Sequence, residues 1–430
     1  MSEVNRRQFV QTSAALAVPL VVPSWAYAWG SEAATIKVGL IGCGGRGTGA
    51  IVQSMRSSAD MQLVALADLL PERIDRAKGE IEKAIASDAT LAPKYKLTPD
   101  RSFSGFDAYK KLLATDVDVV VLATPPGFRP LHLRAAVEAG KHIFAEKPVA
   151  VDAAGVRHVL QTYEMARGKN LGIGVGTQRR HHPGYIEAMN RVRDGAIGDV
   201  LNGQVYWNQG GLWSIEKTPA MSDAEWQIRN WLYFTWLSGD HIVEQHVHNI
   251  DVANWVMNAT PVRAVGVGGR ASRVQPVYGH IYDHFAVDYE YPNGVHIMSM
   301  ARQIQGARGR NGEWFQGTKG KVFTSEGGQP RVEGTNGWEW QRPEGFVQPM
   351  QQEHNDLIAS IKAGKPRNDL KRIAESTLTA IMGRMAAYTG LPVTWEQALN
   401  SKEDTFPKDL TWDMKLPVPP VPHPGQTKLL

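Results

Sequence analysis

A glycine-rich turn between a predicted strand and a predicted helix constrains the fold of this chain more than any other segment. The apolar run 36–41 leads directly into Gly-Cys-Gly-Gly-Arg-Gly at 42–47, and helix-compatible residues continue to position 55. Glycines in this pattern permit a tight turn, close approach of the backbone to a pyrophosphate, and close helix–strand packing. The N-terminus of the helix also offers N–H groups to phosphates. The alternative is a glycine-rich turn without a ligand. We expect a dinucleotide to bind at Gly42, Gly44, Gly45, Arg46 and Gly47.

An acidic residue follows at the spacing that favours NAD. A second apolar run, 61–67, ends at Asp68, which lies 21 residues after Gly47. A carboxylate here can accept a hydrogen bond from the ribose 2′-OH of NAD and would repel the additional phosphate of NADP. The predicted cofactor is therefore NAD, with NADP as the alternative.

The first 28 residues have the features of an export signal. Residues 5–10, Asn-Arg-Arg-Gln-Phe-Val, form a twin-arginine pattern, a short apolar stretch follows, and Ala26-Tyr27-Ala28 matches a cleavage site. We predict that the twin-arginine translocase exports the protein, that residues 1–28 are removed, and that the mature protein is periplasmic or otherwise exported, with no stable membrane span. An ordinary secretion signal and an uncleaved anchor are the alternatives.

Export of a dinucleotide-binding protein has a chemical consequence. There is no soluble cofactor pool outside the cytoplasm, and the twin-arginine route carries proteins that have already folded. We infer that the cofactor is bound before export, held tightly, and recycled in place by a second substrate or by a reaction without net redox change.

Composition excludes several other classes of protein. The formal net charge of the 430 residues is only +4, and no basic patch is interleaved with aromatic residues, so nucleic-acid binding is not expected. No segment after the leader reaches membrane-spanning length. The single cysteine, Cys43, permits neither an internal disulfide nor a cysteine cluster for zinc. The remaining length, about 400 residues, favours two domains.

The predicted elements give an α/β fold with two domains. In residues 35–168 strands and helices alternate, which is typical of a doubly wound parallel sheet of the Rossmann type. Residues 87–104, with proline and polar residues, are expected to be an insertion. The strands are expected at 36–41, 61–67, 117–123 and 142–145, and the helices at 46–57, 71–86, 106–114, 128–139 and 152–168.

Residues 169–400 have the pattern of an α+β domain with a large, open, mostly antiparallel sheet and helices on one face. A strand at 171–177 is expected to lead into it, and residues 292–294, Pro-Asn-Gly, to form a hairpin turn. A late helix at 369–389 is expected to return to the first domain, and residues 404–430 to form a proline-rich arm over a surface or a partner subunit. Other strands are expected at 200–207, 262–268, 284–291 and 295–301.

Two strand ends in the first domain carry candidate site residues. Lys147 follows the strand 142–145 and therefore lies at the carboxyl edge of the parallel sheet, where α/β folds bind ligands. A lysine there can hydrogen-bond a substrate hydroxyl and polarise it during proton removal. The alternative is a surface lysine paired with Glu146. The cofactor contacts expected at these strand ends are Thr124, Pro125, Pro126, Glu146 and Lys147.

A segment dense in titratable residues supplies the candidate base. If 240–255 is one helix, Glu244, His248 and Asp251 share a face, with a carboxylate one turn from His248 on each side. Such neighbours fix the tautomer of an imidazole, so His248 is the candidate base and Glu244 its orienting partner. The alternatives are a structural His248, or a metal site with Glu244, His248 and a third ligand. We expect no metal, and a structural role for His246.

A basic loop and a group of tryptophans offer further contacts. Gln178 is expected to contact the cofactor. Arg179, Arg180 and His181, with Asp251, Lys147 and His248, are expected to bind a polyhydroxylated or anionic substrate; a solvated basic loop is the alternative. Indole rings stack on sugars but more often lie in a core. The tryptophans are Trp207, Trp213, Trp226, Trp231 and Trp236.

Taken together, these motifs resemble the glucose–fructose oxidoreductase/inositol dehydrogenase (Gfo/Idh/MocA) family over nearly the whole mature chain. The resemblance rests on the glycine loop at 42–47, on residues 139–142 leading into Glu146-Lys147-Pro148, and on Glu244-x-x-x-His248-x-x-Asp251. Glu244 stands where many members have aspartate, and His246 where many have glycine.

The resemblance implies a Rossmann domain, an open-sheet domain, and a homodimer or homotetramer formed through that sheet. It implies hydride transfer at a sugar or polyol carbon, with Lys147 as the catalytic lysine and His248 as the acid/base. Some members are exported with bound cofactor, and some are NAD-dependent glycosidases. The primary hypothesis is an exported NAD(P)-dependent oxidoreductase acting on a ring carbon of a sugar, glycoside or cyclic polyol. A redox-neutral glycosidase and a non-catalytic sugar-binding protein are the alternatives.

Overall fold

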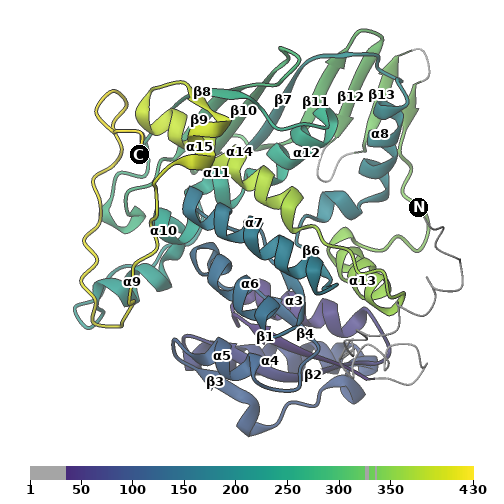
Figure 1. Cartoon of the computed structure of the whole chain (residues 1–430), viewed down its shortest axis with the longest axis vertical. Coiled ribbons are helices and arrows are strands. Elements are labelled where there is room, and N and C mark those ends of the chain that lie inside the picture. The colour runs from purple at the N-terminus through teal and green to yellow at the C-terminus, as the bar shows by residue number, and fades with distance from the viewer. Residues whose placement is uncertain (1–34, 325–328, 335–336) are drawn as a thin grey trace, which may run out of the picture. The chain divides into compact units, whose positions relative to one another are not determined.

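Two β-sheets form the framework of the computed structural model (Figure 1), which describes residues 35–324, 329–334 and 337–430. The predicted twin-arginine signal, residues 1–28, lies outside these residues. Of the helices in the described residues, none is both long enough and apolar enough to cross a membrane.

The first sheet has six strands in the order β3-β2-β1-β4-β5-β6, and every neighbouring pair is parallel. β4 and β5 are buried at every position, because helices cover both faces of the sheet. The predicted doubly wound parallel sheet is confirmed. Its strands are β1 (Ile36–Ile41), β2 (Met61–Asp68), β3 (Ser102–Ser104), β4 (Val119–Leu122), β5 (His142–Ala145) and β6 (Ile173–Val175).

The helices of this half begin and end within two residues of their predicted bounds. α3 packs against α4, and α6 packs against α5 and α7. Hydrophobic periodicity located them because each has one face on the sheet. They are α3 (Gly45–Arg56), α4 (Pro71–Ser87), α5 (Ala108–Leu113), α6 (Arg129–Glu138) and α7 (Ala153–Gly168).

Two predictions about the first sheet were wrong. The expected insertion at 87–104 contains the short helices η1 (Ala89–Lys94) and η2 (Pro99–Arg101), and it ends in β3, which pairs with β2. The strand at 171–177, expected to lead into the second domain, forms β6 and pairs in parallel with β5. A run of three strand residues carries no sign of the sheet that it joins.

The second sheet has nine strands in the order β14-β13-β12-β11-β7-β10-β9-β8-β15. β7 and β10 are parallel and the other neighbouring pairs are antiparallel, which confirms the predicted mostly antiparallel sheet. The predicted turn at 292–294 joins β9 to β10, with φ of +75° at Gly294. The strands are β7 (Val200–Gln209), β8 (Arg263–Gly269), β9 (His284–Glu290), β10 (His296–Gln303), β11 (Arg310–Gly317), β12 (Gly320–Thr324), β13 (Arg331–Gly334), β14 (Trp338–Glu339) and β15 (Val393–Thr394).

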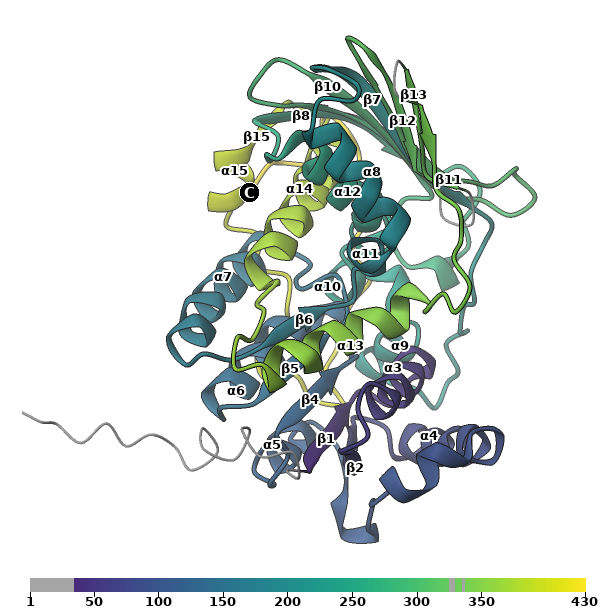
Figure 2. The same ribbon diagram turned by 90° about the vertical axis from the view of Figure 1, so that its right-hand side faces the viewer.

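Helices cover one face of the second sheet, as Figure 2 shows for α8, α12 and α14. β9 accordingly alternates between buried and partly exposed residues. The helices are α8 (Pro183–Arg193), α9 (Asp223–Arg229), α10 (Thr235–Ser238), α11 (His241–Glu244), α12 (Val247–Met257), α13 (Pro349–Lys362), α14 (Leu370–Thr389) and α15 (Trp395–Asn400), with shorter turns at η3 (Pro126–Phe128), η4 (Gln178–His181), η5 (Trp231–Tyr233) and η6 (Pro276–Tyr278).

The late helix α14 links the two halves, as the sequence predicted. It packs against α7 as well as β8. The guanidinium of Arg384, buried in α14, donates hydrogen bonds to Val151 O at 2.8 Å and Gly239 O at 3.0 Å, and it pairs with Glu403 at 2.6 Å. The segment that follows α15 is therefore tied to the same junction.

Residues 401–430 form no helix or strand, and they pack against other parts of the same chain. We call residues 404–430 the C-terminal arm. Thr405 N–H donates to Asp152 Oδ2 at 2.7 Å, and the Trp412 ring lies 5.0 Å from the Phe106 ring. The arm thus runs from α7 to the end of the first sheet that carries β3.

Candidate active site

The glycine loop has the geometry that its sequence requires. Gly42 has a φ of +101°, a region that favours glycine, and its N–H donates to Ala67 O at 2.8 Å. A Cβ atom at Gly47 would lie 1.9 Å from Gly42 O, so only glycine fits where α3 crosses the end of β1. α3 begins at Gly45 after Gly44, which provides no side-chain cap for the first N–H groups. These features fit a pyrophosphate at the loop.

Asp68 closes the loop from the end of β2. Its Oδ2 accepts a hydrogen bond from Cys43 N–H at 2.6 Å, and its Oδ1 accepts one from Leu70 N–H at 2.9 Å. Burial raises the pKa of Asp68, and the two backbone hydrogen bonds oppose that rise. The carboxyl group lines a large pocket, where it is placed to bind a ribose hydroxyl.

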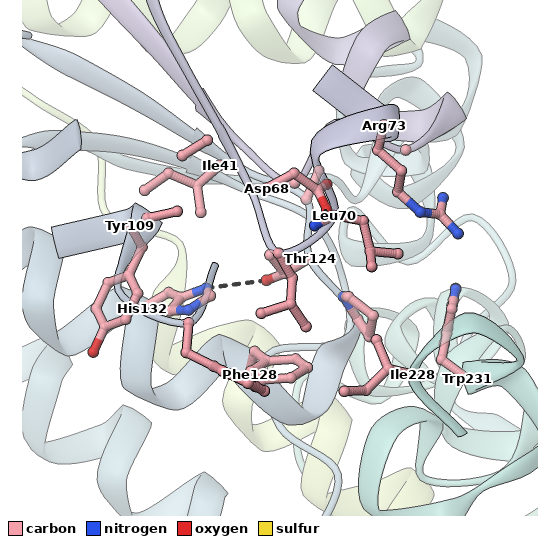
Figure 3. A pocket seen from close by; sticks show the side chains of 18 of the residues that line it. Ile41, Asp68, Leu70, Arg73, Tyr109, Thr124, Phe128, His132, Ile228 and Trp231 are labelled. Atoms are coloured by element: carbon pink, nitrogen blue, oxygen red, sulfur yellow. Dashed lines mark hydrogen bonds between the residues drawn. The ribbon is translucent and has the colours of Figure 1, made fainter. Parts of the chain in front are cut away.

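This large pocket has a volume of about 870 Å³ and lies along the carboxyl edge of the first sheet. Ile228 and Trp231 lie on the side opposite Asp68 and Arg73, as Figure 3 shows. Thr124, in the middle of the view, is 3.1 Å from the Nδ1 atom of His132. Phe406, Pro407, Asp409 and Leu410 of the C-terminal arm complete the lining.

A smaller pocket, of about 260 Å³, adjoins the large one. Arg46, Ala123 and Thr124 line both pockets, so the two meet at the glycine loop. The structure gathers every predicted cofactor contact at these pockets. Those that line the small pocket are Arg46, Thr124, Pro126, Glu146, Lys147 and Gln178.

Lys147 forms an ion pair across the small pocket. Its Nζ lies 2.8 Å from Glu244 Oε1 and donates also to Glu244 O at 2.5 Å. Glu146 does not take the lysine, because its Oε1 accepts from Arg46 Nε at 2.5 Å. The alternative of a surface lysine paired with Glu146 is therefore wrong.

His248 lines the same pocket from the first turn of α12. Its ring stacks on the Trp207 ring with centroids 5.6 Å apart. Burial lowers the pKa of His248 well below its usual value, and the positive charges of Lys147 and Arg179 lower it further. The imidazole is therefore neutral near pH 7, which leaves one ring nitrogen with a lone pair that can accept a hydrogen bond.

The expected single helix over 240–255 is divided. α11 ends at Glu244, and α12 begins at Val247. His246, between them, is buried with its Nε2 2.7 Å from Ser299 Oγ, which fits its expected structural role. The interruption turns Glu244 toward Lys147, and in the described part of the chain neither Glu244 nor Asp251 hydrogen-bonds His248. The predicted orientation of His248 by Glu244 was wrong.

The predicted substrate contacts beyond Lys147 and His248 lie outside both pockets. Three of them are instead paired with carboxylates of the protein. Arg179 Nη1 lies 2.8 Å from Glu313 Oε1, Arg180 Nε lies 2.8 Å from Asp251 Oδ2, and His181 Nδ1 lies 2.5 Å from Asp356 Oδ2.

Asp251 binds three partners in the core of the second domain. Besides Arg180, it accepts hydrogen bonds from Arg372 at 3.0 Å and from Ser376 Oγ at 2.8 Å. Burial opposes its ionisation, but Arg180 and Arg372 hold the pKa of Asp251 below its usual value. These charged residues bind one another in the core and line neither of the two pockets.

Two residues of the small pocket were not predicted from the sequence, and the roles of the tryptophans were left open. Met350 and Glu353 reach the small pocket from α13, about 200 residues after Lys147 in the sequence, and no local motif marks them. Trp207 and Trp231 line the small pocket, whereas Trp226 and Trp236 are buried in an aromatic core. Among the described residues, no group of three or more His, Cys, Asp or Glu side chains is placed to hold a metal ion.

Two family profiles match this chain. Residues 36–177 match the GFO/IDH/MocA oxidoreductase family, described as an NAD-binding Rossmann fold, and residues 185–323 match the GFO/IDH/MocA C-terminal domain. The first profile ends two residues after β6, which agrees with the place of β6 in the first sheet.

Curated relatives include inositol dehydrogenases. Inositol 2-dehydrogenase of Gluconacetobacter diazotrophicus is 27% identical over 264 residues, which are 61% of this chain and 66% of that protein. Inositol 2-dehydrogenase 3 of Saccharopolyspora erythraea is 27% identical over 61% of this chain and 65% of that protein. The chain thus spans slightly less than two thirds of the length of these relatives.

Solved structures with the same fold include a levoglucosan dehydrogenase in complex with NADH and levoglucosan. It superposes with a TM-score of 0.65 at 18% identity, over 84% of this chain and 99% of that one. An aldose-aldose oxidoreductase from Caulobacter crescentus, complexed with glycerol, gives 0.63 at 20% identity, over 84% and 100%. With its glycine loop, its two sheets and profile matches over more than half of its length, this chain belongs to the Gfo/Idh/MocA family, and its residues 36–177 are an NAD-binding Rossmann domain.

Proposed function

We propose that this protein is an NAD-dependent oxidoreductase that transfers a hydride to or from a ring carbon of a sugar, glycoside or cyclic polyol. The observation that carries this proposal is that Lys147, Glu244 and His248 line one small pocket that joins the pocket of the glycine loop. The inositol and levoglucosan dehydrogenases among the similar proteins support a substrate with ring hydroxyl groups.

Each residue has a role that its surroundings permit. The buried, neutral His248 takes the proton of the reacting hydroxyl. The Lys147 ammonium, held by Glu244, donates a hydrogen bond to the same oxygen and stabilises the negative charge that develops there. Trp207 and Trp231 offer apolar ring faces to a sugar. Bound NAD supplies the hydride acceptor.

Turnover with a panel of substrates tests this function. The mature protein is mixed with inositols, levoglucosan or aldoses, with and without added NAD⁺, and NADH, bound or free, is followed by its absorbance. We expect the wild type to reduce NAD⁺. The Lys147→Met and His248→Asn variants should do so at least about 100-fold more slowly. Release of the aglycone from glycosides without net NADH would point to the redox-neutral glycosidase instead. Binding of a sugar without either reaction would support the third hypothesis, a non-catalytic sugar-binding protein.

We propose further that the cofactor is held tightly and recycled in place. The C-terminal arm supports this, because its residues 406–410 line the large pocket and a departing nucleotide would have to pass them. The arm is held by α9, where Gln227 Nε2 donates to Leu416 O at 2.6 Å, and by the contact between Trp412 and Phe106.

Assay of the nucleotide released on denaturing the purified protein tests this retention. We expect about one NAD(H) per chain, and an empty protein would contradict the proposal. In the Phe406→Ala/Leu410→Ala variant NADH should dissociate at least about tenfold faster, since two large apolar contacts are lost. Val418→Ala/Val421→Ala, at exposed arm positions away from the pocket, is the matched control.

Export is proposed on the twin-arginine pattern of the sequence alone. Residues 1–34 fused to a folded reporter should carry it out of the cytoplasm. The Arg6→Lys/Arg7→Lys variant should keep the reporter inside, and transport that continues in this variant would favour an ordinary secretion signal.

Self-association through the second sheet is also proposed. The face away from the helices exposes apolar side chains, with Val265 47%, Val267 68% and Met300 37% exposed. Contiguous apolar patches of this kind mark interaction surfaces. Light scattering should give a dimer or tetramer that Val267→Asp dissociates and Val418→Asp leaves intact. A monomeric wild type would contradict this proposal.

A further inference from the structure

A buried acid at the small pocket has one oxygen without a hydrogen-bond partner among the described residues. Glu353, in α13, is 2% exposed and lines this pocket together with Lys147 and His248. Within the described residues its Oε2 has no hydrogen-bond partner. Its Oε1 lies 3.8 Å from Arg46 Nη2, which is beyond hydrogen-bonding distance. Buried polar atoms in folded proteins nearly always have partners, so this carboxyl group is placed to bind a ligand.

The guanidinium of Arg46, which forms an ion pair with Glu353, already donates hydrogen bonds to other residues. Arg46 donates from Nε to Glu146 Oε1 at 2.5 Å and from Nη2 to Gln53 Oε1 at 3.0 Å. The side chain of Glu146 is 9% exposed and that of Glu353 2%. One arginine therefore stands between two buried carboxyl groups and neutralises the nearer one.

These surroundings favour the neutral form of Glu353. Burial raises the pKa of Glu353 well above its usual value, and the negative charge of Glu146 raises it further, whereas Arg46 lowers it. Asp369 and Arg367 act in opposite directions. A neutral carboxyl group carries an O–H donor beside a C=O acceptor, so it matches a ligand group with one acceptor and one donor.

The position of the small pocket indicates which ligand group this is. With a ribose at Asp68 and the pyrophosphate at the glycine loop, a dinucleotide extends its other end past Arg46 and Thr124, which line both pockets. That end is the nicotinamide, whose carboxamide presents a planar C=O and N–H₂ pair. A neutral carboxylic acid and a carboxamide can pair through two hydrogen bonds, whereas a carboxylate can only accept.

We propose that Glu353, as a neutral acid, binds the nicotinamide carboxamide of NAD through paired hydrogen bonds and thereby orients the ring in the small pocket. This deepens the proposed function and rests on it only in taking NAD as the cofactor. Glu353 reaches the small pocket because α13, which follows β14 in sequence, packs against α3 and β6 of the first domain.

Calorimetric titration of nucleotide-free protein with NADH and with ADP-ribose tests this contact, because ADP-ribose lacks the nicotinamide. Glu353→Met removes both hydrogen-bonding atoms at similar volume, and Glu353→Gln keeps a donor and an acceptor. We expect Glu353→Met to bind NADH about tenfold more weakly or worse and ADP-ribose within about twofold of the wild type. Glu353→Gln should bind NADH within about threefold of the wild type.

A second test uses only the wild-type protein, so its result does not depend on whether a variant folds. Reduced 3-acetylpyridine adenine dinucleotide keeps the acceptor oxygen but lacks the amide N–H₂. It should bind the wild type about fivefold more weakly than NADH, because one of the two hydrogen bonds is missing. Equal affinities for the two nucleotides would overturn the paired contact.

Three outcomes with the variants would also overturn the proposal. NADH affinity of Glu353→Met equal to that of the wild type would show no contact. A Gln variant as weak as the Met variant would show that charge is needed and the neutral acid is not. Parallel loss of ADP-ribose affinity would show that Glu353 supports the loop. If NADH binding follows the expectation but no sugar or polyol is oxidised, the proposed function fails while the Glu353 contact stands.

Discussion

Lys147 and Glu244 are 97 residues apart in the sequence, yet their side chains form an ion pair with an Nζ–Oε1 distance of 2.8 Å. The two side chains are only 12% and 11% exposed. Lys147 follows β5 of the first sheet, and Glu244 ends α11, which packs on α14 and β10. The pair therefore fixes Lys147 only when both halves of the protein are packed together.

Removing one partner of this ion pair should destabilise the protein more than removing both partners. Glu244→Leu leaves a buried ammonium without its counter-charge, and we expect the free energy of unfolding to fall by about 3 kcal/mol. The Lys147→Met/Glu244→Leu variant should recover most of that loss while remaining inactive. Urea unfolding of the single and double variants measures both effects. A double variant less stable than Glu244→Leu would show that the pair does not behave as a buried salt bridge.

Two neighbouring glycines should respond differently to the same substitution. In Gly47→Ala the added Cβ would meet Gly42 O at 1.9 Å, so the loop must shift, and NADH affinity should fall by about 100-fold or more. Gly45→Ala is the matched control, because no atom lies within 4 Å of its Cβ position. Fluorescence titration with NADH compares the two variants. Similar losses in both would mean that the loop tolerates no side chain for reasons other than this contact.

Acid should destabilise the protein through its buried histidines. Burial lowers the pKa of His246 to about 3, and of His142 and His280 to about 4. The unfolded chain, in which histidine titrates near ~6.5, then binds more protons than the folded one as the pH falls below that value. Each group should lower the free energy of unfolding by up to about 1.4 kcal/mol per pH unit between ~6.5 and ~4.

Urea unfolding at pH 7, 6 and 5 measures this slope. His280→Gln removes one titrating group at the site where His280 Nε2 meets Thr235 Oγ1 at 2.8 Å. The stability of this variant should depend less steeply on pH than that of the wild type. An unchanged slope would show that folding does not lower the pKa of His280.

Arg180 should matter for stability and not for substrate binding. It is buried against Asp251 and stacks over the Trp255 ring at 4.1 Å. We expect Arg180→Met to lower the free energy of unfolding by about 3 kcal/mol, since among the described residues Arg372 is then the one charged partner left to Asp251. The KM of the folded variant for its sugar or polyol should stay within about threefold of the wild type. A large rise in KM with unchanged stability would return Arg180 to the substrate site.

Local patterns predicted the glycine loop, the helices of the first domain and its strands β1, β2, β4 and β5. The turn at 42–47 and the hairpin at 292–294 depend on the backbone freedom of glycine, which the sequence states directly. Lys147 was located because the end of a parallel strand has a known place in an α/β fold. The same reasoning placed Asp68 beside the loop.

Long-range pairing is what the sequence did not reveal. At the interruption between α11 and α12, His246 hydrogen-bonds the Ser299 hydroxyl, a contact that a helical pattern over 240–255 cannot show. The directions of Arg179 and Arg180 depend on carboxylates from β11 and α12. Glu353 lies in an ordinary amphipathic helix, and only the packing of α13 on α3 brings it to the pocket.

The two walls of the large pocket are made at different times. The ribosome makes the glycine loop and β2 early, and about 340 residues follow before Phe406 and Leu410 emerge. At ordinary rates of synthesis this interval is on the order of tens of seconds. During it, a nascent chain can present a folded nucleotide site that is still open on one side, and the arm can be laid over whatever nucleotide is already there.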